Sequence, residues 1–242
     1  MGVITWFFHG KVAKAYSQRK LPLCVVSGSA GFWGAIHHAN VQIDGAAYGE
    51  AGAFAPDWKT VLQKARQEKP SWLRLFTARY ERIAGWTQRY VAAAEKRSGE
   101  QVLSHRDLDP KNVLWDGMEP FLIDWEAAGY VNPERELIEV VNYWACNQRG
   151  RLDREKFRAL LAAYQMNRPL LHTDWPAVLD SGYGGMLEWL LYNMKRSLGI
   201  ECSSQEERRL GTAQVRGTLH ALDAYERKTA LLLEWLREDC DA

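Results

Sequence analysis

The chain has 242 residues, of which 47% are hydrophobic and 25% charged, a composition typical of a folded globular protein and not of a disordered one. Its 31 Lys and Arg residues nearly balance its 30 Asp and Glu residues, so no overall field draws it to nucleic acid or to an anionic membrane. The four cysteines lack zinc-ligand spacing, the N-terminus lacks a signal-peptide pattern, and no apolar run reaches the roughly 20 residues of a membrane span. We expect a cytoplasmic protein that binds neither nucleic acid nor membrane.

The N-terminal part of the chain carries few clear signals of secondary structure. Residues 3–8, VITWFF, combine β-branched and aromatic side chains and predict a short buried strand. The charged stretch 11–20 is interpreted as a solvated helix. The apolar run 21–26 fits either a separate apolar segment or the opening of a helix predicted at 31–40, and its periodicity does not decide between them. Residues 41–56, rich in Gly and Ala and without a period, predict a loop.

Helical periodicity dominates the rest of the chain. Between residues 57 and 97, apolar side chains recur three and four positions apart, and a break at Pro70 and Ser71 divides them into two predicted helices. The same spacing predicts helices around 137–144 and 157–164, and at 184–198 and 205–237. The predicted fold class is therefore α+β and predominantly α-helical.

Residues 98–126 interrupt this helical pattern. Short apolar groups at 102–103, 113–115 and 121–123 predict strands, and Asp116-Gly117 is a tight-turn pair between the last two. The expected structure is a loop followed by a small β-hairpin. Because one strand of the hairpin begins after residue 112 and the other ends before residue 124, the two positions should meet at one edge.

The polar residues of this region have a distinctive spacing. His105 and Asp107 are followed by Asn112, and Asp124 comes twelve residues later, directly after the apolar triplet. This pattern resembles the catalytic and magnesium-binding loops of protein kinases. It is more similar to the aminoglycoside phosphotransferase and choline kinase superfamily, because Trp125 follows Asp124 and gives an I-D-W motif in place of D-F-G.

The resemblance implies a protein-kinase-like C-terminal lobe that uses ATP and Mg²⁺, with the hairpin carrying the catalytic and metal loops. Phosphoryl transfer depends on positioning and charge neutralisation, and each residue then has an implied role. Asp107 would accept or orient the proton of the attacking hydroxyl, and His105 would brace the catalytic loop. Asn112 and Asp124 offer the hard oxygen ligands that Mg²⁺ prefers. Lys111, near the implied phosphate path, is the candidate nucleotide-binding residue.

Other positions depart from the family or have weaker roles. Arg106, Asp109 and Lys111 replace the family's commoner Gly, His and Gly. A cationic acceptor would be bound by carboxylates, unless these are simply solvated on helix surfaces; the candidates are Glu126, Glu136 and Glu139. The C-terminal helices that wall the acceptor site in the family would include Glu188, Trp189, Tyr192 and Asn193, and we expect the two aromatic residues to pack in the core.

The resemblance also implies a division of the chain. Residues 3–10, VITWFFHG, resemble the family's hinge strand. The expected parts are a remnant hinge strand at 1–10 and a C-terminal lobe at 11–242, with catalytic and metal loops at 103–126 and a helical acceptor-side subdomain at 134–242. Most of the family's N-terminal lobe would then be missing, and the surface it leaves open would favour self-association.

Three functional hypotheses follow. The first is an ATP-dependent phosphotransferase that transfers the γ-phosphate to a hydroxyl of a small, cationic acceptor such as an aminoglycoside, choline or an amino sugar. The alternative is a catalytically inactive truncated remnant, or a pseudokinase-like binding module without a closed nucleotide site. A helical interaction protein without kinase ancestry is the third.

Overall fold

The computed structural model describes residues 3–8, 11–16, 21–41, 54–96, 101–117, 119–147, 149, 151–171, 173–200 and 202–240. The chain divides into two compact units. The first unit comprises residues 1–50, 99–173 and 239–242, and the second comprises 51–98 and 174–238. Among the described residues, none of the helices combines the length and the apolar character needed to cross a bilayer.

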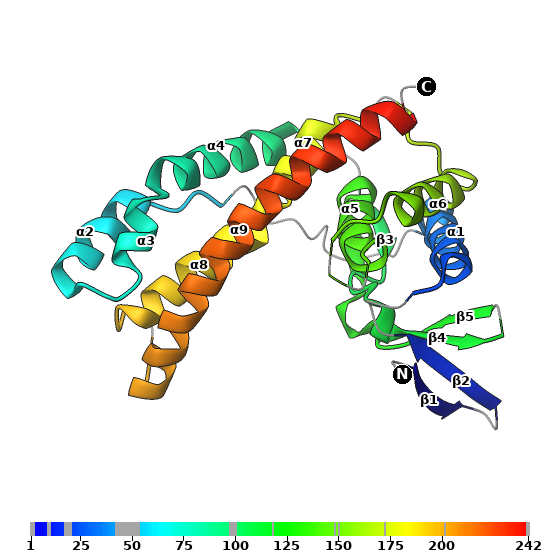
Figure 1. The fold of residues 1–242 in the computed structure, drawn as a ribbon, viewed down its shortest axis with the longest axis horizontal. Helices are drawn as coiled ribbons and strands as arrows, with labels where there is room; N and C mark the ends of the chain where they lie inside the picture. The colour runs from blue at the N-terminus through cyan, green and yellow to red at the C-terminus, as the bar shows by residue number, and fades with distance from the viewer. Residues whose placement is uncertain are drawn as a thin grey trace. The chain divides into compact units, whose positions relative to one another are not determined.

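Two small antiparallel sheets form part of the first unit (Figure 1). Strands β1 (Val3–Phe8), β2 (Lys11–Tyr16), β4 (Val113–Asp116) and β5 (Glu119–Leu122) pair in the order β1-β2-β4-β5. The β4–β5 pair is the predicted hairpin, and Gly117 takes the positive φ of 63° that its turn requires. The second sheet pairs β3 (Val102–Ser104) with β6 (Gly129–Val131).

Strand β2 corrects the interpretation of residues 11–20 as a helix. Its residues pair with β1 on one side and with β4 on the other, where Lys14 faces Trp115. Hydrogen bonding to two neighbouring strands outweighs the modest helix propensity of a Lys- and Ala-rich segment. The prediction was therefore wrong for tertiary reasons that the local sequence does not carry.

Among the described residues of the first unit, the α-helices are α1 (Leu23–Ala39), α5 (Pro133–Trp144) and α6 (Arg154–Gln165). Helix α1 settles the ambiguity at 21–26, because that apolar run opens the helix. Figure 1 shows α1 and α6 side by side. Trp33 and Trp144 form a T-shaped pair with ring centroids 4.7 Å apart, and the Trp144 indole donates a 2.7 Å hydrogen bond to the Leu108 carbonyl. The helices are thereby tied to the loop that follows β3.

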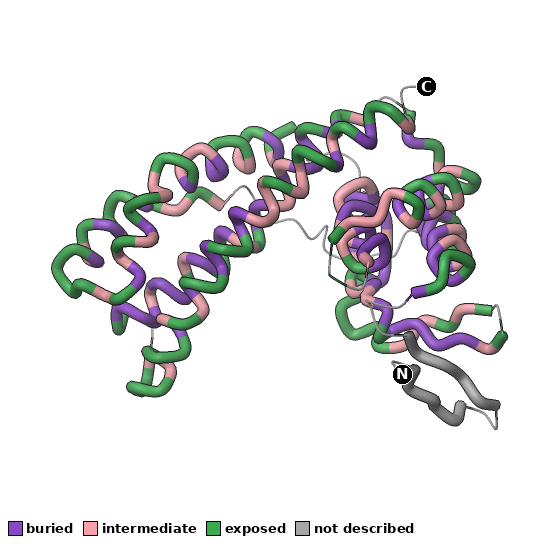
Figure 2. Tube along the Cα trace, viewed as in Figure 1, coloured by how far each residue is buried: buried purple, intermediate pink, exposed green. Residues whose placement is uncertain are grey.

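The described residues of the second unit form helices and the short connections between them. It contains α2 (Trp58–Glu68), α3 (Leu73–Thr77), α4 (Tyr80–Lys96), α7 (Trp175–Ser181), α8 (Tyr183–Ser197) and α9 (Gln205–Cys240). The two helices predicted before residue 97 are α2 and α4, with the short α3 between them, and α7 was not predicted. Figure 2 shows buried residues recurring along these helices, and they meet in one apolar core. Among its members are Trp72, Phe76, Trp86, Leu187, Leu190 and Leu219.

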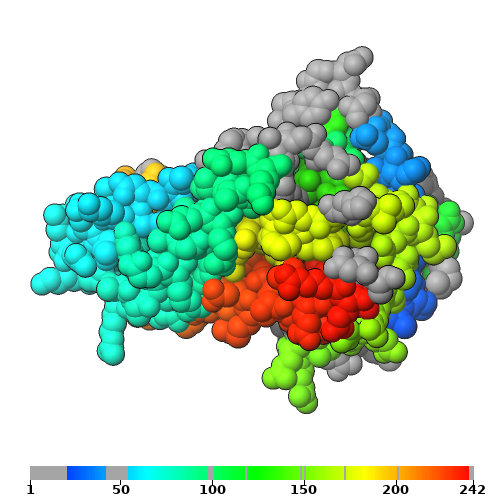
Figure 3. Space-filling model, turned by 90° about the horizontal axis from the view of Figure 1, so that it is seen from above, coloured from blue at the N-terminus to red at the C-terminus, as the bar shows by residue number. Residues whose placement is uncertain are grey.

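Ion pairs fasten α9 to the helices beside it. Arg79 donates two hydrogen bonds, of 2.9 and 2.7 Å, to the same oxygen of Asp223, and the Trp86 indole donates one of 2.9 Å to Glu226. The space-filling view shows α4 and α9 next to each other at the surface (Figure 3). Because Asp223 and Glu226 are three positions apart on one helix, both face α4.

Candidate active site

His105 joins the loop after β3 to the end of β5. Its side chain is fully buried. Nε2 donates to the Ile123 carbonyl at 2.8 Å, which leaves Nδ1 to accept from the Asp107 backbone N–H at 3.3 Å. The ring also meets the edge of Trp125, with centroids 4.8 Å apart. Both ring nitrogens therefore serve the conformation of the two loops, which is the arrangement that a bracing role requires.

Asp107 and Asn112 are held together by the Asn112 amide. Its Nδ2 donates to the Asp107 carbonyl oxygen at 2.9 Å and to Asp107 Oδ2 at 2.8 Å. Two acceptors on one side fix the orientation of the amide and leave Oδ1 as the atom that a ligand can use. The Asp107 carboxylate is about a third exposed, so it is at once anchored and accessible.

Asp124 lies at the same edge of the hairpin as Asn112. The Ile123 N–H donates to the Asn112 carbonyl at 3.0 Å, which joins the chain entering β4 to the chain leaving β5. Asp124 then turns into the left-handed region, at φ 67° and ψ 58°, and precedes the short helix η3 (Trp125–Ala127). Its side chain is exposed and makes no capping hydrogen bond to η3. The carboxylate is therefore free of a structural role at the helix end.

These donors fit a magnesium ion shared with a nucleotide. Within the part of the chain that the structure describes, no group of three or more His, Cys, Asp or Glu side chains is placed to hold a metal. Mg²⁺ commonly takes only one or two protein oxygens and completes its shell with water and phosphate. The amide of Asn112 and the carboxylate of Asp124 meet that demand, whereas a closed protein cage would not form here.

Lys111 lies beside Asp107. The turn η2 (Pro110–Asn112) is capped by Asp109, whose Oδ1 accepts from the Lys111 N–H at 2.9 Å. The Lys111 ammonium is 3.5 Å from Asp107 Oδ2, and 65% of the side chain is exposed. An exposed pair of this kind contributes little to stability, so the ammonium remains available to a phosphate.

Helix α5 presents carboxylates with different roles. Glu136 is buried and accepts hydrogen bonds from His37 and from the Arg106 backbone, so it is not available to a cationic acceptor. Glu139 pairs with Arg135 at 3.4 Å. Burial raises its pKa, and the negative charge of Glu136 adds to the rise. Glu126, on η3, is exposed.

The pKa of the Tyr143 phenol reflects the charges near Asp107. Burial raises the pKa of the Tyr143 phenol, and the negative charges of Glu139, Asp109 and Asp107 raise it further. These three carboxylates therefore act on one partly exposed hydroxyl. Lys111 and Arg135 are paired with two of these carboxylates and offset part of their charge.

The predicted acceptor-side residues lie in the second unit. Trp189 and Tyr192 stack with centroids 5.5 Å apart and remain 46% and 44% exposed, which corrects the expectation that they pack in the core. The buried face of α8 is occupied instead by Leu187 and Leu190. Asn193 is buried, and its amide donates to the Trp189 carbonyl at 2.9 Å, while Glu188 is exposed.

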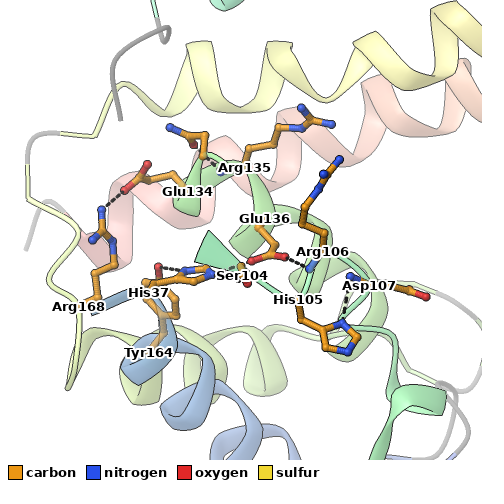
Figure 4. Close-up of polar contacts among 11 residues, drawn as sticks. His37, Ser104, His105, Arg106, Asp107, Glu134, Arg135, Glu136, Tyr164 and Arg168 are labelled. Carbon is orange, nitrogen blue, oxygen red and sulfur yellow. Dashed lines mark hydrogen bonds and ion pairs between the residues drawn. The ribbon is translucent and has the colours of Figure 1, made fainter. Parts of the chain in front are cut away.

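Three residues at the back of the site escaped the sequence analysis. His37, Ser104 and Tyr164 are buried, and His37 is hydrogen-bonded to the other two and to Glu136 (Figure 4). The sequence offered one weak signal for them. His37 lies one helical turn after Trp33 and Gly34, so it falls on the buried face of α1. The partners of these three residues lie more than 60 residues away in the chain, so spacing alone could not reveal them.

Comparison with known proteins defines the class. A family model described as the phosphotransferase enzyme family matches residues 28–172, more than half of the chain, and the chain belongs to that family. The predicted superfamily and the predominantly helical, protein-kinase-like fold are thus confirmed.

Solved structures give the individual likenesses. Spectinomycin phosphotransferase APH(9)-Ia, in complex with ADP and spectinomycin, is similar with a TM-score of 0.60 and 14% identity; the match covers 91% of this chain and 70% of that one. A choline/ethanolamine kinase family protein from Mesorhizobium loti matches with a TM-score of 0.49 and 14% identity, and the match covers 88% of this chain and 65% of that one. Choline kinase LicA from Streptococcus pneumoniae matches with a TM-score of 0.48 and 14% identity, and the match covers 91% of this chain and 75% of that one. The likeness to the spectinomycin phosphotransferase, with its TM-score of 0.60, shows a common fold.

Proposed function

We propose that this chain is an ATP-dependent phosphotransferase that transfers the γ-phosphate to a hydroxyl of a small cationic acceptor. The observation that carries the proposal is the convergence of Asp107, Asn112 and Asp124 on one edge of the β4–β5 hairpin. Membership of the phosphotransferase family supports it. The setting would be the cytoplasm.

Each side chain has a defined task in this proposal. Asp107 orients the acceptor hydroxyl and takes up its proton, in a position fixed by the Asn112 amide. Asn112 Oδ1 and the Asp124 carboxylate would hold Mg²⁺, and the ion would supply positive charge to the nucleotide phosphates. His105 keeps the two loops in register. The Lys111 ammonium, which pairs with Asp107 in this structure, approaches the phosphates and offsets part of their negative charge.

The acceptor is expected to be cationic for electrostatic reasons. Asp107, Asp109 and Glu139 all raise the pKa of the Tyr143 phenol, so three carboxylates gather near it, with Lys111 and Arg135 paired to two of them. A cation drawn to these carboxylates would bring a neighbouring hydroxyl towards Asp107. The similar structure with a TM-score of 0.60 is a spectinomycin phosphotransferase in complex with ADP and spectinomycin.

The decisive experiment is a calorimetric titration of the purified chain with ATP, with and without Mg²⁺. We expect binding that requires Mg²⁺ and is lost in Asp124→Asn. The matched control is Asp116→Asn, because Asp116 ends the same strand that Asn112 precedes and lies at the turn of the hairpin. Equal affinity in Asp124→Asn and in the wild type would refute the metal assignment.

Turnover then separates the enzyme from a binding module. Release of ADP is followed with choline, spectinomycin and a neutral polyol such as glycerol as acceptors. The proposal predicts acceptor-dependent ADP release with a cationic compound and none from Asp107→Asn. Binding of Mg²⁺ and ATP without transfer to any hydroxylated cation would identify the alternative, a pseudokinase-like module. Sedimentation of the same sample tests the predicted self-association.

A further inference from the structure

A cavity of about 340 Å³ opens in the second unit, where the end of α2, the end of α8 and the first turns of α9 meet (Figure 1). We call it the α9 cavity. All of its lining residues belong to the second unit, so it is built without any residue of the candidate active site. Polar side chains dominate its wall, among them Glu68, Ser71, Ser197, Gln205, Arg208 and Arg209.

A chain of hydrogen bonds holds the wall that α8 and α9 form. The Trp72 indole donates to Ser197 Oγ at 2.8 Å, and the Thr212 hydroxyl donates to the Arg208 carbonyl at 2.9 Å. A hydroxyl carries one proton, so the 2.6 Å bond between the two hydroxyls is donated by Ser197 to Thr212. Because both hydroxyl protons are used inside the protein, this wall is fixed before any ligand binds.

The two arginines of the cavity differ in their partners. Arg208 Nε donates to the Ser197 carbonyl at 2.9 Å, and its Nη2 lies 3.3 Å from Glu68 Oε2. Arg209 is exposed at the cavity, and none of the described residues is hydrogen-bonded or ion-paired to its guanidinium. Arg208 is therefore held in place with part of its guanidinium unused, and Arg209 has all five of its donors available.

The carboxylates near the cavity already have partners. Glu68 is shared between Arg208, at 3.3 Å, and Lys64, at 3.4 Å. Glu207 does not line the cavity, and it accepts from the Ser203 N–H at 2.7 Å and from the Ser203 hydroxyl at 3.0 Å, bonds that lower its pKa. Among the described residues that line the cavity, arginines outnumber glutamates by two to one. The lining thus carries an excess of positive charge.

The size and the lining of the cavity suit a small anion. Its volume lies near the lower end of the roughly 300–1,000 Å³ of ligand pockets, which are usually lined by apolar side chains. Here hydroxyl, amide and guanidinium groups take their place. Ser71 follows α2, whereas Gln205 and Arg209 lie on α9, so donors reach the cavity from different elements. A tetrahedral phosphate accepts hydrogen bonds from several directions, whereas a carboxylate accepts close to one plane.

We infer that the α9 cavity binds a phosphoryl group, either free phosphate or the phosphate of a small ester. Arg209 is its main partner, and Arg208, Ser71 and Gln205 surround it. The inference does not rest on the proposed function, because no residue of the cavity takes part in the proposed transfer. It adds a second anion site to a chain whose overall charge is close to zero.

The first test is a calorimetric titration of the full chain with inorganic phosphate and with glycerol 3-phosphate, in buffer free of Mg²⁺ and phosphate. We expect saturable binding of both compounds and none of glycerol. Tighter binding of the ester would assign the cavity to a phosphorylated metabolite, and equal affinity would assign it to free phosphate. Arg209→Gln should weaken the affinity about 10- to 100-fold, the effect of losing a charged hydrogen-bond donor.

Two variants serve as controls. Arg227→Gln makes the same change of charge at an exposed position of α9 that does not line the cavity, and we expect unchanged affinity. Lys111→Gln, in the first unit, should also leave the affinity unchanged. Three results would overturn the inference: no saturable binding of either phosphate, equal loss in Arg209→Gln and Arg227→Gln, or loss in Lys111→Gln without loss in Arg209→Gln.

The second test locates the ligand. With saturating glycerol 3-phosphate, hydrogen exchange should slow by at least about threefold at 69–72 and 205–212, and exchange in the first unit should stay unchanged. Protection confined to the first unit would overturn the inference. A wild type that neither binds Mg²⁺-ATP nor transfers phosphate would refute the proposed function, whereas both tests of the α9 cavity would keep their meaning.

Discussion

Gly34 is the position in α1 where a side chain would collide with α6. A Cβ built on Gly34 would lie 2.6 Å from the Tyr164 carbonyl oxygen and 3.3 Å from Tyr164 Cα and Asn167 Cβ. The nearest of these atoms belongs to the backbone and cannot rotate away. Gly34→Ala must therefore push the two helices apart, and it does so at Tyr164, whose hydroxyl is hydrogen-bonded to His37.

The magnitude follows from two opposing terms. Alanine in place of glycine inside a helix gains about 0.5–1 kcal/mol, and forcing an extra carbon into a packed interface costs about 1–3 kcal/mol. With a contact as short as 2.6 Å against backbone, the second term should dominate. We expect Gly34→Ala to lower the free energy of unfolding by roughly 1–2 kcal/mol.

Gly31→Ala is the matched control, one turn earlier on the same helix. Its Cβ would meet only the Ala163 carbonyl oxygen, at 3.8 Å, an ordinary van der Waals contact. The helix-propensity gain then stands alone, and Gly31→Ala should raise the free energy of unfolding by about 0.5–1 kcal/mol. The two substitutions are chemically identical and should have opposite signs.

Urea denaturation followed by circular dichroism measures both variants. An unchanged m-value would show that the shift in midpoint reflects stability and not a change in the unfolded state. Thermal midpoints should move by about 2–4 °C per kcal/mol for a chain of this size. If Gly34→Ala is as stable as the wild type, or if Gly31→Ala is equally destabilised, the steric argument for the α1–α6 contact is wrong.

Three further predictions concern single side chains. Burial alone would raise the pKa of Asp223, but the Arg79 guanidinium lowers it below its ordinary 3.8. Asp223→Asn should therefore lower the free energy of unfolding by about 2 kcal/mol near neutral pH. This difference from the wild type should shrink as the pH falls below about 4. A difference in urea midpoint that does not vary with pH would contradict this. Trp125→Ala removes the ring contact with His105, so it should lower the free energy of unfolding by about 1 kcal/mol or less. It should also weaken the affinity for Mg²⁺-ATP measured by calorimetry. Unchanged affinity would argue against a role of His105 in holding the two loops. Burial raises the pKa of Glu139, so the wild type should lose stability relative to Glu139→Gln as the pH rises from about 4 to 7. The variant should also show a higher KM for a cationic acceptor. An unchanged KM would show that Glu139 is not part of the acceptor site.

The predicted hairpin was accessible from sequence because its contacts are local. Asn112 and Ile123 are joined across a turn of a few residues, and the Asp116-Gly117 pair marks that turn. The I-D-W string around Asp124 then identifies the family. A short motif with strict spacing carries its own geometry, so the edge of the hairpin could be predicted without knowledge of the surrounding helices.

The residues that support the site could not be predicted in the same way. His37 and Glu136 are 99 positions apart, and a carboxylate near the start of a charged helix resembles a solvated one until α1 and β3 cover it. Strand β2 has the same difficulty, because its partner β4 lies about a hundred residues further on. Helix α7 spans only 7 residues, too few for a helical period to stand out.

The backbone of the site shows why this support is needed. Among the described residues, Asn40 and Lys69 take a positive φ at the ends of helices, where the left-handed conformation is a common termination. Arg106 and Asp124 take it within the candidate active site, where neither residue ends a helix at its C-terminus. Left-handed backbone persists only where its surroundings hold it.

His105 connects the two left-handed turns, because it bonds the residue before Asp124 and the residue after Arg106. The Arg106 N–H is in turn held by Glu136 and, through it, by His37. The loops that carry Asp107 and Asp124 are therefore one mechanically connected body whose far end is buried between α1 and α6. A substitution at that far end should disturb the site through these bonds, although by less than one beside it, which is the physical reason to probe Tyr164 and Gly34 as well as the carboxylates.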